Sequence, residues 1–176
     1  QAVHLAIDRK AAIEFVHQGS GMVGGFLPTF GEWTIPLDEL MKMPGYRYPK
    51  DQDIAEAKRL LAEAGYPNGF DTVYNPAFWV YHTQIAEAVT AMLAQVGIRA
   101  EIKPFELAAW SVRRRQLTFE GITQIIVGPE PPFEQITRHY DWEKGEPNWS
   151  LFGYRNPELL RLVRAGVAEG DPEKQN

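Results

Sequence analysis

Residues 70–102 restrict the possible folds most strongly, because they encode a strand, a helix and a second strand in succession. The 70–75 segment is rich in apolar and aromatic residues, which is typical of a strand. The 83–96 segment repeats apolar side chains at helical spacing. The 98–102 segment alternates apolar with charged residues, as a half-buried strand does. This order predicts a right-handed βαβ unit with two parallel strands.

Helices are expected to flank this unit. Asp53 followed by Glu56 predicts a capping box at the start of a helix whose apolar stripe continues to Ala64. Asp8 predicts the N-cap of a helix near the beginning of the chain. Asn156, followed by a proline at the first helical position, predicts the N-cap of the last helix.

The remaining segments complete the prediction of the fold. The 122–127 segment is an almost continuous apolar run, which predicts a central strand covered on both faces, and a helix is expected over 106–115 before it. The long 31–51 segment contains several prolines, so we expect it to be irregular and either functional or wrapped over a surface. We therefore predict a single α/β domain over residues 1–176, with a small mixed sheet flanked by helices.

Charge and cysteine content exclude several classes of function. The net charge of −5 gives no reason to expect nucleic acid or an anionic membrane as a partner. The absence of cysteine excludes disulfides, thiolate metal sites and a cysteine nucleophile. No apolar run approaches the roughly 18 residues that a membrane span requires. Both ends of the chain read as interrupted helices, so we expect a piece of a longer protein whose targeting signals lie outside it.

Motifs for catalysis are weak in this sequence. The glycine-rich 19–25 segment lacks the Gly-Lys-Ser/Thr ending of a phosphate-binding loop, which favours a flexible connector. Glu130, Glu134 and His139 lie near one another in sequence, with Asp141 just beyond them, and could supply an acid, a base and metal ligands. A small carboxylate-dependent hydrolase is therefore an alternative function, while a solvated acidic loop is the simpler interpretation.

Aromatic residues are concentrated after the predicted strands. The first group follows the 70–75 strand and contains Phe78, Trp79 and Tyr81. The second group follows the 122–127 strand and consists of Phe133, Tyr140, Trp142, Trp149 and Phe152. In open α/β sheets, ligands bind at the carboxyl ends of the strands. Aromatic faces with a few polar groups form a typical wall for a small ligand, so the two groups predict a binding site.

Four motifs follow one another along the chain: Gln1-Ala2-x-x-x-Ala6-Ile7-Asp8-Arg9 with Ile13; Asp53-x-Ala55-x-Ala57-Lys58-x-Leu60-Leu61-Ala62-Glu63-Ala64-Gly65-Tyr66-Pro67-x-Gly69-Phe70; Ala86-Glu87 through Leu93 to Val96-Gly97-Ile98; and Gly153-Tyr154-x-Asn156-Pro157-Glu158. This series resembles the family 5 extracellular solute-binding proteins, which include the dipeptide and oligopeptide receptors of ABC importers. The resemblance implies a two-lobed receptor that closes on its ligand and docks on a membrane permease. It further implies that this chain is most of the second lobe, with a periplasmic-binding-protein-like (type II) fold.

The resemblance also implies roles for residues after the 122–127 strand. Peptide-binding members have a glycine, an aromatic and an acidic residue there, and the acid pairs with the amino group of the ligand. Gly128 matches the glycine, Glu130 is the candidate for the acid, and Phe133 lies in the same segment. This chain departs from the family pattern at Pro131-Pro132, where an Asp-Pro pair is usual.

A second departure concerns the carboxylate of the ligand. Some members carry an arginine just after the first strand, where it can bind a carboxylate bidentately, but residues 75–78 contain none. This absence argues against a strict dipeptide receptor. An oligopeptide bound through its backbone, or an oligosaccharide stacked on Trp79 and Trp149, remains open.

These observations lead to one expected function. We expect a substrate-binding component of an ABC transporter, without a catalytic set, metal or cofactor, that binds a peptide or a related small solute and delivers it to a permease. The expected location is periplasmic, or on the cell surface as a lipoprotein. The isolated lobe is expected to expose apolar surface, through which it could form a homodimer. The predicted ligand-binding residues are Phe78, Trp79, Gly128, Glu130, Phe133 and Trp149.

Overall fold

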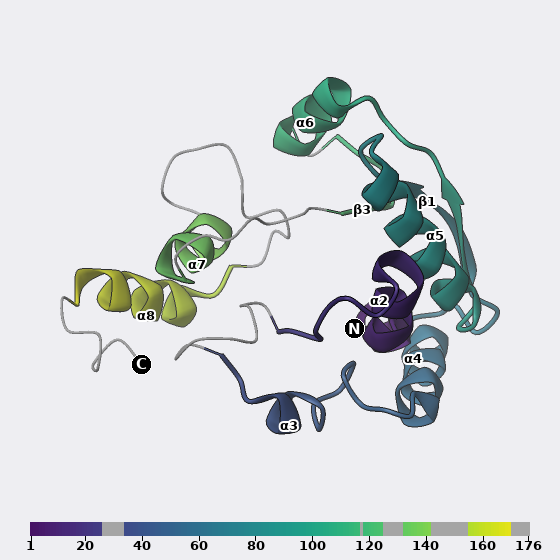
Figure 1. The fold of residues 1–176 in the computed structure, drawn as a ribbon, viewed down its shortest axis with the longest axis horizontal. Coiled ribbons are helices and arrows are strands. Elements are labelled where there is room, and N and C mark those ends of the chain that lie inside the picture. The colour runs from purple at the N-terminus through teal and green to yellow at the C-terminus, as the bar shows by residue number, and fades with distance from the viewer. Residues whose placement is uncertain (26–33, 117, 125–131, 142–154, 170–176) are drawn as a thin grey trace. The chain divides into compact units, whose positions relative to one another are not determined.

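The computed structural model describes residues 1–25, 34–116, 118–124, 132–141 and 155–169 (Figure 1). The elements are α1 (Ala2–Ala6), α2 (Arg9–His17), α3 (Leu37–Leu40), α4 (Asp51–Glu63), β1 (Phe70–Asn75), α5 (Val80–Ala94), β2 (Ile98–Ile102), α6 (Leu107–Gln116), β3 (Ile122–Thr123), α7 (Pro132–Tyr140) and α8 (Pro157–Ala168). They fall into two compact units. The first comprises residues 1–110 and 119–124, and the second contains the described residues among 111–118 and 125–176. The single domain over 1–176 stays a prediction.

The predicted βαβ unit is present in the first unit of the structure. Strands β1 and β2 pair in parallel, in a register that runs from Phe70 opposite Ile98 to Tyr74 opposite Ile102. Strand β3 pairs in parallel with the other edge of β1, so the order is β2-β1-β3. The expectation of a central strand at 122–127 is therefore wrong for the part described, because β1 holds the centre and β3 lies at an edge. Residues 125–127 lie outside the described part of the chain.

A close contact between two glycines fixes the entry into β1 relative to the entry into β2. The backbone N–H of Phe70 donates to the carbonyl oxygen of Gly97, 3.1 Å away. Both Gly69 and Gly97 have positive φ angles, +72° and +93°, which residues other than glycine rarely adopt. A Cβ atom on Gly69 would overlap the carbonyl group of Gly97. The two strands can therefore start side by side only because neither residue carries a side chain.

The hydrophobic core lies between the sheet and the helices of the first unit. Helix α5 packs against β2, and α1 packs against α4 and α5 (Figure 1). Ala57 on α4 and Ala86 on α5 are fully buried, and their small side chains permit close packing. The core cluster consists of Leu5, Ala6, Ala57, Leu61, Tyr74, Ala86, Val89, Leu93, Val96 and Ile98.

The helix caps agree with the sequence at two of the three predicted positions. The side chain of Asp8 accepts a hydrogen bond from the N–H of Ala11, and that of Asn156 accepts from the first turn of α8, so both N-caps are confirmed. The capping box at Asp53 is wrong. Helix α4 begins at Asp51 with Lys50 as its N-cap residue, and Asp53 lies inside the helix with its carboxylate buried.

The second unit is described mainly by two helices. Helix α7 packs against α8, and the guanidinium of Arg164 on α8 donates two hydrogen bonds to the carboxylate of Asp141, at 2.8 and 3.0 Å. Val163 and Leu160 of α8 are buried, in keeping with its apolar face. Among the described residues of both units, no helix combines the length and apolar character needed to cross a membrane.

Candidate ligand-binding site

The carboxyl edge of the sheet is built by the chain as it leaves β1 and β2. After β1, Ala77 forms a parallel bridge with Phe105, which follows β2. The N–H of Phe78 donates to the carbonyl oxygen of Phe105 at 2.6 Å, and the N–H of Phe105 donates to that of Pro76 at 3.0 Å. Pro76 and Ala77 are buried. The backbone between β1 and α5 is therefore held rigidly against the neighbouring segment.

Four consecutive apolar or aromatic side chains leave this rigid backbone toward solvent. Phe78 is 63% exposed and Trp79 is 61% exposed, and Val80 and Tyr81 are also exposed. We call residues 78–81 the aromatic edge. The location of Phe78 and Trp79 at the carboxyl end of β1 was predicted and is confirmed, whereas their role in binding stays a prediction.

A buried histidine lies directly beneath the aromatic edge. His82, on the first turn of α5, is only 4% exposed. Its ring is perpendicular to that of Trp79, with centroids 5.8 Å apart and planes at 90°, and the centroid of the Trp110 ring lies 6.3 Å from that of His82. Burial lowers the pKa of His82, although the carbonyl of Ala77 acts in the opposite direction. Sequence reasoning missed His82 as a site residue; the only local signal was its position one helical turn after Trp79.

Hydrogen bonds attach Trp110 to the sheet. The indole Nε1–H of Trp110 donates to Oγ1 of Thr123 at 2.9 Å. The hydroxyl of Thr123 donates in turn to the carbonyl oxygen of Asn75 at 2.8 Å. Since Asn75 is the last residue of β1 and Thr123 the last of β3, Trp110 is fixed to the ends of both strands.

A second set of hydrogen bonds joins the same strands to α5. The hydroxyl of Tyr74 donates to Oε1 of Gln124 at 2.7 Å, and Nε2 of Gln124 donates to the carbonyl oxygen of His82 at 3.2 Å. Burial raises the pKa of Tyr74 to about 12, so the phenol stays protonated and able to donate. The polar and aromatic side chains beneath the aromatic edge are thus connected to one another by hydrogen bonds and ring contacts.

The other predicted binding residues are not brought to this edge by the described structure. Gly128, Glu130 and Trp149 lie outside the described residues. Phe133 lies on α7, but its side chain is outside the described part. Their grouping with Phe78 and Trp79 stays a prediction.

The residues of the hydrolase alternative are partly described. His139 is buried on α7, and its Nδ1 donates to the carbonyl oxygen of Gln135 at 2.7 Å. The carboxylate of Asp141 is engaged by Arg164. Glu130 and the side chain of Glu134 lie outside the described part. The described members of this set therefore make structural contacts within their own unit.

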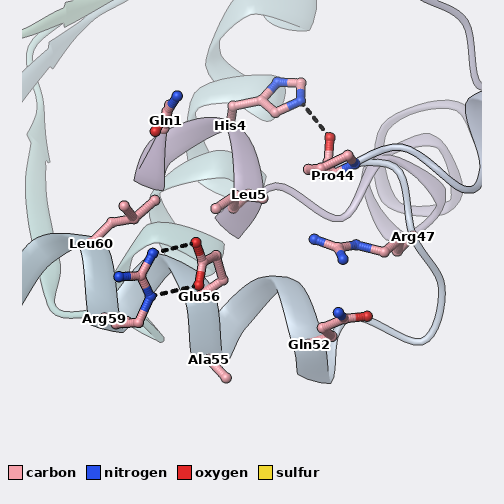
Figure 2. Close-up of a pocket in the computed structure, with 10 residues that line it drawn as sticks. All are labelled: Gln1, His4, Leu5, Pro44, Arg47, Gln52, Ala55, Glu56, Arg59 and Leu60. Atoms are coloured by element: carbon pink, nitrogen blue, oxygen red, sulfur yellow. Dashed lines mark hydrogen bonds and ion pairs between the residues drawn. The ribbon is translucent and has the colours of Figure 1, made fainter.

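A separate cavity of about 1040 Å³ opens beside α1 and α4 (Figure 2). Its charged residues are already paired: Arg59 binds Glu56 through two hydrogen bonds, and Arg47 binds Asp53. The lining residues are Gln1, His4, Leu5, Pro44, Arg47, Gln52, Ala55, Glu56, Arg59 and Leu60. Each Arg and Glu side chain of the lining is therefore already engaged in an ion pair.

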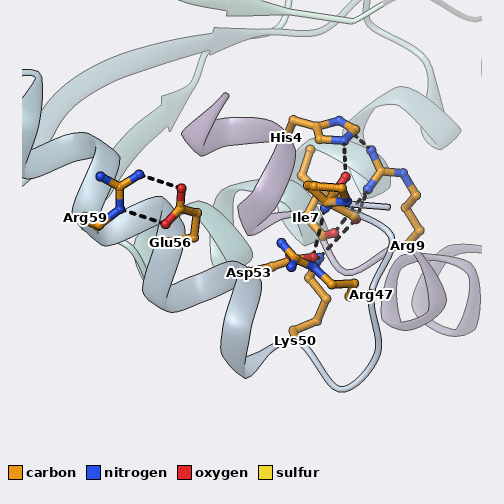
Figure 3. A network of polar contacts seen from close by, with 10 residues as sticks. His4, Ile7, Arg9, Arg47, Lys50, Asp53, Glu56 and Arg59 are labelled. Carbon is orange, nitrogen blue, oxygen red and sulfur yellow. Dashed lines mark hydrogen bonds and ion pairs between the residues drawn. The ribbon is translucent and has the colours of Figure 1, made fainter. Parts of the chain in front are cut away.

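The wall of this cavity is held by a polar network around Asp53 (Figure 3). The carboxylate of Asp53 accepts from the N–H of Gly45 at 3.0 Å, from Nζ of Lys50 at 2.7 Å and from Nε of Arg47 at 2.7 Å. Burial acts to raise the pKa of Asp53, but Lys50 and Arg47 together bring it below its ordinary value. The 45–50 loop is thereby fastened to α4.

His4 joins the same loop to the first helix. Its Nε2 donates to the carbonyl oxygen of Pro44 at 3.0 Å, while Nδ1 accepts from the guanidinium of Arg9 at 3.1 Å. Arg9 also lies 4.1 Å from the centroid of the Tyr46 ring. Burial lowers the pKa of His4, and the positive charges of Arg9 and Lys50 act in the same direction, against the bond to Pro44. His4 therefore serves as a neutral bridge.

Relatives of the chain bind different solutes. Heme-binding protein A of Haemophilus influenzae is 34% identical, in a match that covers 66% of this chain and 21% of that protein. Glutathione-binding protein GsiB of Pectobacterium atrosepticum is 31% identical, over 86% of this chain and 26% of that protein. The chain thus spans about a fifth to a third of the length of the curated relatives it matches.

Solved structures with the same fold cover almost the whole chain. Haemophilus influenzae OppA, in complex with the peptide RPPGFSPFR, has a TM-score of 0.78 at 22% identity, over 99% of this chain and 34% of that one. The periplasmic murein tripeptide-binding protein MppA, in its open form, has a TM-score of 0.77 at 20% identity, over 99% of this chain and 33% of that one. The predicted periplasmic-binding-protein-like α/β fold is confirmed, but the described strands pair only in parallel, so the expectation of a mixed sheet is wrong for the described residues.

The family model for "Bacterial extracellular solute-binding proteins, family 5 Middle" matches residues 1–144. This match includes β1, α5 and β2 and all of the aromatic edge. The chain therefore belongs to the family 5 bacterial extracellular solute-binding proteins.

Proposed function

We propose that this chain forms a ligand-contacting lobe of a receptor that delivers a small solute, most simply a peptide, to an ABC importer. The observation that carries the proposal is the aromatic edge, because four apolar side chains are exposed on a rigid backbone at the carboxyl end of a parallel sheet. Ligands of open α/β sheets bind at this edge. Membership of a solute-binding family supports the same interpretation.

The choice of ligand class rests on the relatives and on the charge of the edge. Named relatives bind haem and glutathione, and similar folds have been solved with the peptides RPPGFSPFR and STSA. Residues 75–81 contain no Asp, Glu, Lys or Arg. A wall of this kind suits the backbone and apolar side chains of an oligopeptide better than a charged terminus.

The complete site in this proposal has two parts. Phe78 and Trp79 supply the apolar wall. Gly128, Glu130, Phe133 and Trp149 are proposed to supply the facing segment, with Glu130 pairing with the amino group of the ligand. Because an acid is available and no arginine follows β1, we expect the amino end of the peptide to contribute more to binding than its carboxylate.

The proposal is tested by titrating the 176-residue chain with tetra-alanine, glutathione, haemin and cellobiose, followed by NMR of isotope-labelled protein. Tetra-alanine should shift the backbone signals of residues 76–82 and leave those of the Asp53 network unchanged. N-acetylated tetra-alanine should bind more weakly than the free peptide, and the C-terminal amide about equally. Failure of all four ligands to shift residues 76–82, or release of free alanine during the titration, would contradict the proposal.

Location and partners extend this proposal to the longer protein. The family is one of extracellular solute-binding proteins, which supports a site of action outside the cytoplasmic membrane. A lipid anchor, a permease partner and a homodimer of the isolated lobe remain proposals. For the homodimer, sedimentation of the 176-residue chain at rising concentration should show reversible self-association, and a constant monomer mass would count against it.

A further inference from the structure

We propose that Trp79 is a stacking platform for a flat aromatic or conjugated group of the ligand, and that His82 and Trp110 hold its indole in position. The inference rests on the proposed function and deepens it, since it assigns a ligand class to the aromatic edge. It also assigns a positioning role to two residues that are themselves buried.

The exposure of Trp79 is the first observation. A tryptophan side chain that is 61% exposed forgoes much of the free energy that burying it would provide. Its indole is nevertheless in a perpendicular ring contact with a residue that is 4% exposed. The indole is therefore held against a buried ring while most of its surface stays open to a stacking partner.

The geometry of the contact is the second observation. Aromatic rings attract one another edge-to-face when their centroids are about 4.5–7 Å apart, because the positive edge of one ring meets the negative face of the other. Trp79 and His82 satisfy this at 5.8 Å and 90°. Burial lowers the pKa of His82, so its ring is neutral near pH 7 and is an ordinary aromatic partner.

The third observation is that other residues hold His82 in place. Trp110 lies 6.3 Å from His82, and the indole N–H of Trp110 is bonded through Thr123 to the last residue of β1. The carbonyl of His82 also accepts from Gln124. A continuous series of contacts thus runs from the sheet to Trp79. Such support reduces the ordering cost that a free surface side chain incurs on binding.

The ligand class follows from the absence of charged residues in the segment that carries the aromatic edge. With no Asp, Glu, Lys or Arg in residues 75–81, recognition here depends on ring faces and apolar contact rather than on ion pairs. Among peptides, those with a tryptophan or tyrosine side chain present a flat group that Trp79 can stack on.

The first experiment compares Ala-Ala-Trp-Ala with Ala-Ala-Ala-Ala on the 176-residue chain, with binding followed by the backbone amide signals of residues 76–82. The tryptophan peptide should bind about threefold to tenfold more tightly, the range expected of one aromatic pair. Replacing Trp79 by Ala should abolish this preference, and replacing it by Phe should retain most of it. Phe15 on α2 is similarly exposed, so Phe15→Ala is the matched control and should preserve the preference.

The second experiment tests the positioning role of His82. His82→Ala should remove the preference, so that the tryptophan peptide binds no more tightly than tetra-alanine. His82→Phe restores a ring at the same place and should recover the preference. Recovery by Phe distinguishes ring support from a general structural role, which a larger buried side chain would not restore.

The outcomes separate the two proposals. Equal binding of both peptides to the original chain, or an unchanged preference in Trp79→Ala, overturns the stacking platform and leaves the proposed function intact. An unchanged preference in His82→Ala overturns the positioning role. If neither peptide shifts residues 76–82, the platform fails, and the proposed function fails with it only when glutathione, haemin and cellobiose also leave these signals unchanged.

Discussion

The carboxylate of Asp53 fastens the 45–50 loop to α4. It accepts hydrogen bonds from Gly45 and Arg47 in the loop and from Lys50 at the start of α4. Because Asp53 is fully buried, its charge is stabilised only by these donors. A single residue therefore fixes the 45–50 loop, and its loss would leave two cations without their shared anion.

Replacing Asp53 by Asn should destabilise the chain strongly. Breaking a buried ion pair by removing one partner costs about 3 kcal/mol or more. Asp38→Asn is the control, because Asp38 pairs with Lys42 on an exposed helix face, where ion pairs contribute little. Urea denaturation should show a large fall in the free energy of unfolding for Asp53→Asn and almost none for Asp38→Asn. Similar values for the two variants would contradict the role assigned to Asp53.

The histidines predict how stability depends on pH. The pKa values of His4 and His82 are lowered in the folded chain, so the unfolded chain takes up protons first as the pH falls. Their contribution to stability is complete above the unfolded value of about 6.5 and is lost progressively below it. The urea concentration at the midpoint of unfolding should therefore decrease as the pH is lowered from 7.5 to 5.5. His4→Gln should make the urea midpoint less dependent on pH. An unchanged dependence would exclude His4 as a contributor.

At the scale of elements, the strand–helix–strand unit was predictable and the network around Asp53 was not. Periodic patterns in residues 70–102 depend on local spacing, which the sequence displays directly. The capping-box pattern at Asp53 is also local, but the partners that bury its carboxylate come from the preceding loop. Pairing with the preceding loop overrode the pattern for a helix start.

The candidate site divides in the same way. Phe78 and Trp79 could be placed at the edge of the sheet because they directly follow β1. The burial of His82 depends on Trp110, which belongs to another helix, and no pattern in the sequence relates the two. The position of β3 at the edge of the described sheet was likewise missed, because a continuous apolar run predicts burial but does not assign strand order.

The glycine contact before β1 gives a prediction about elements. Gly69→Ala should destabilise the chain by more than about 2 kcal/mol, since it adds the cost of a positive φ to a clash with the backbone of Gly97. Gly65→Ala is a close control, because Gly65 has φ +89° but no atom within 4 Å of the added Cβ. Gly65→Ala should cost only about 1–2 kcal/mol. If the two variants lose equal free energy of unfolding in urea denaturation, the backbone at Gly97 can move away from the added Cβ without cost.

At the scale of the whole molecule, the chain covers only about a third of the length of similar receptors of known structure. In the proposed function the ligand is held between two walls, of which the described aromatic edge is a part of one. A single wall buries less of a ligand than an enclosed pocket does. Affinity measured on this chain should therefore report the aromatic edge by itself.

We expect the chain alone to bind a peptide at least tenfold more weakly than the longer protein that contains it. The reason is that contacts with the second wall and the free energy of closure are both missing. Calorimetric titration of both proteins with Ala-Ala-Trp-Ala measures the difference. Submicromolar affinity of the 176-residue chain would contradict this expectation.

The exposed run from Phe78 to Tyr81 has a practical consequence for handling the protein. Contiguous apolar side chains on a surface promote association between molecules, so these residues limit how far a ligand-free sample can be concentrated. Replacing them with charged residues would improve solubility but would remove the proposed wall. Adding a bound ligand as an excipient should improve shelf life without this loss, because it covers the same surface.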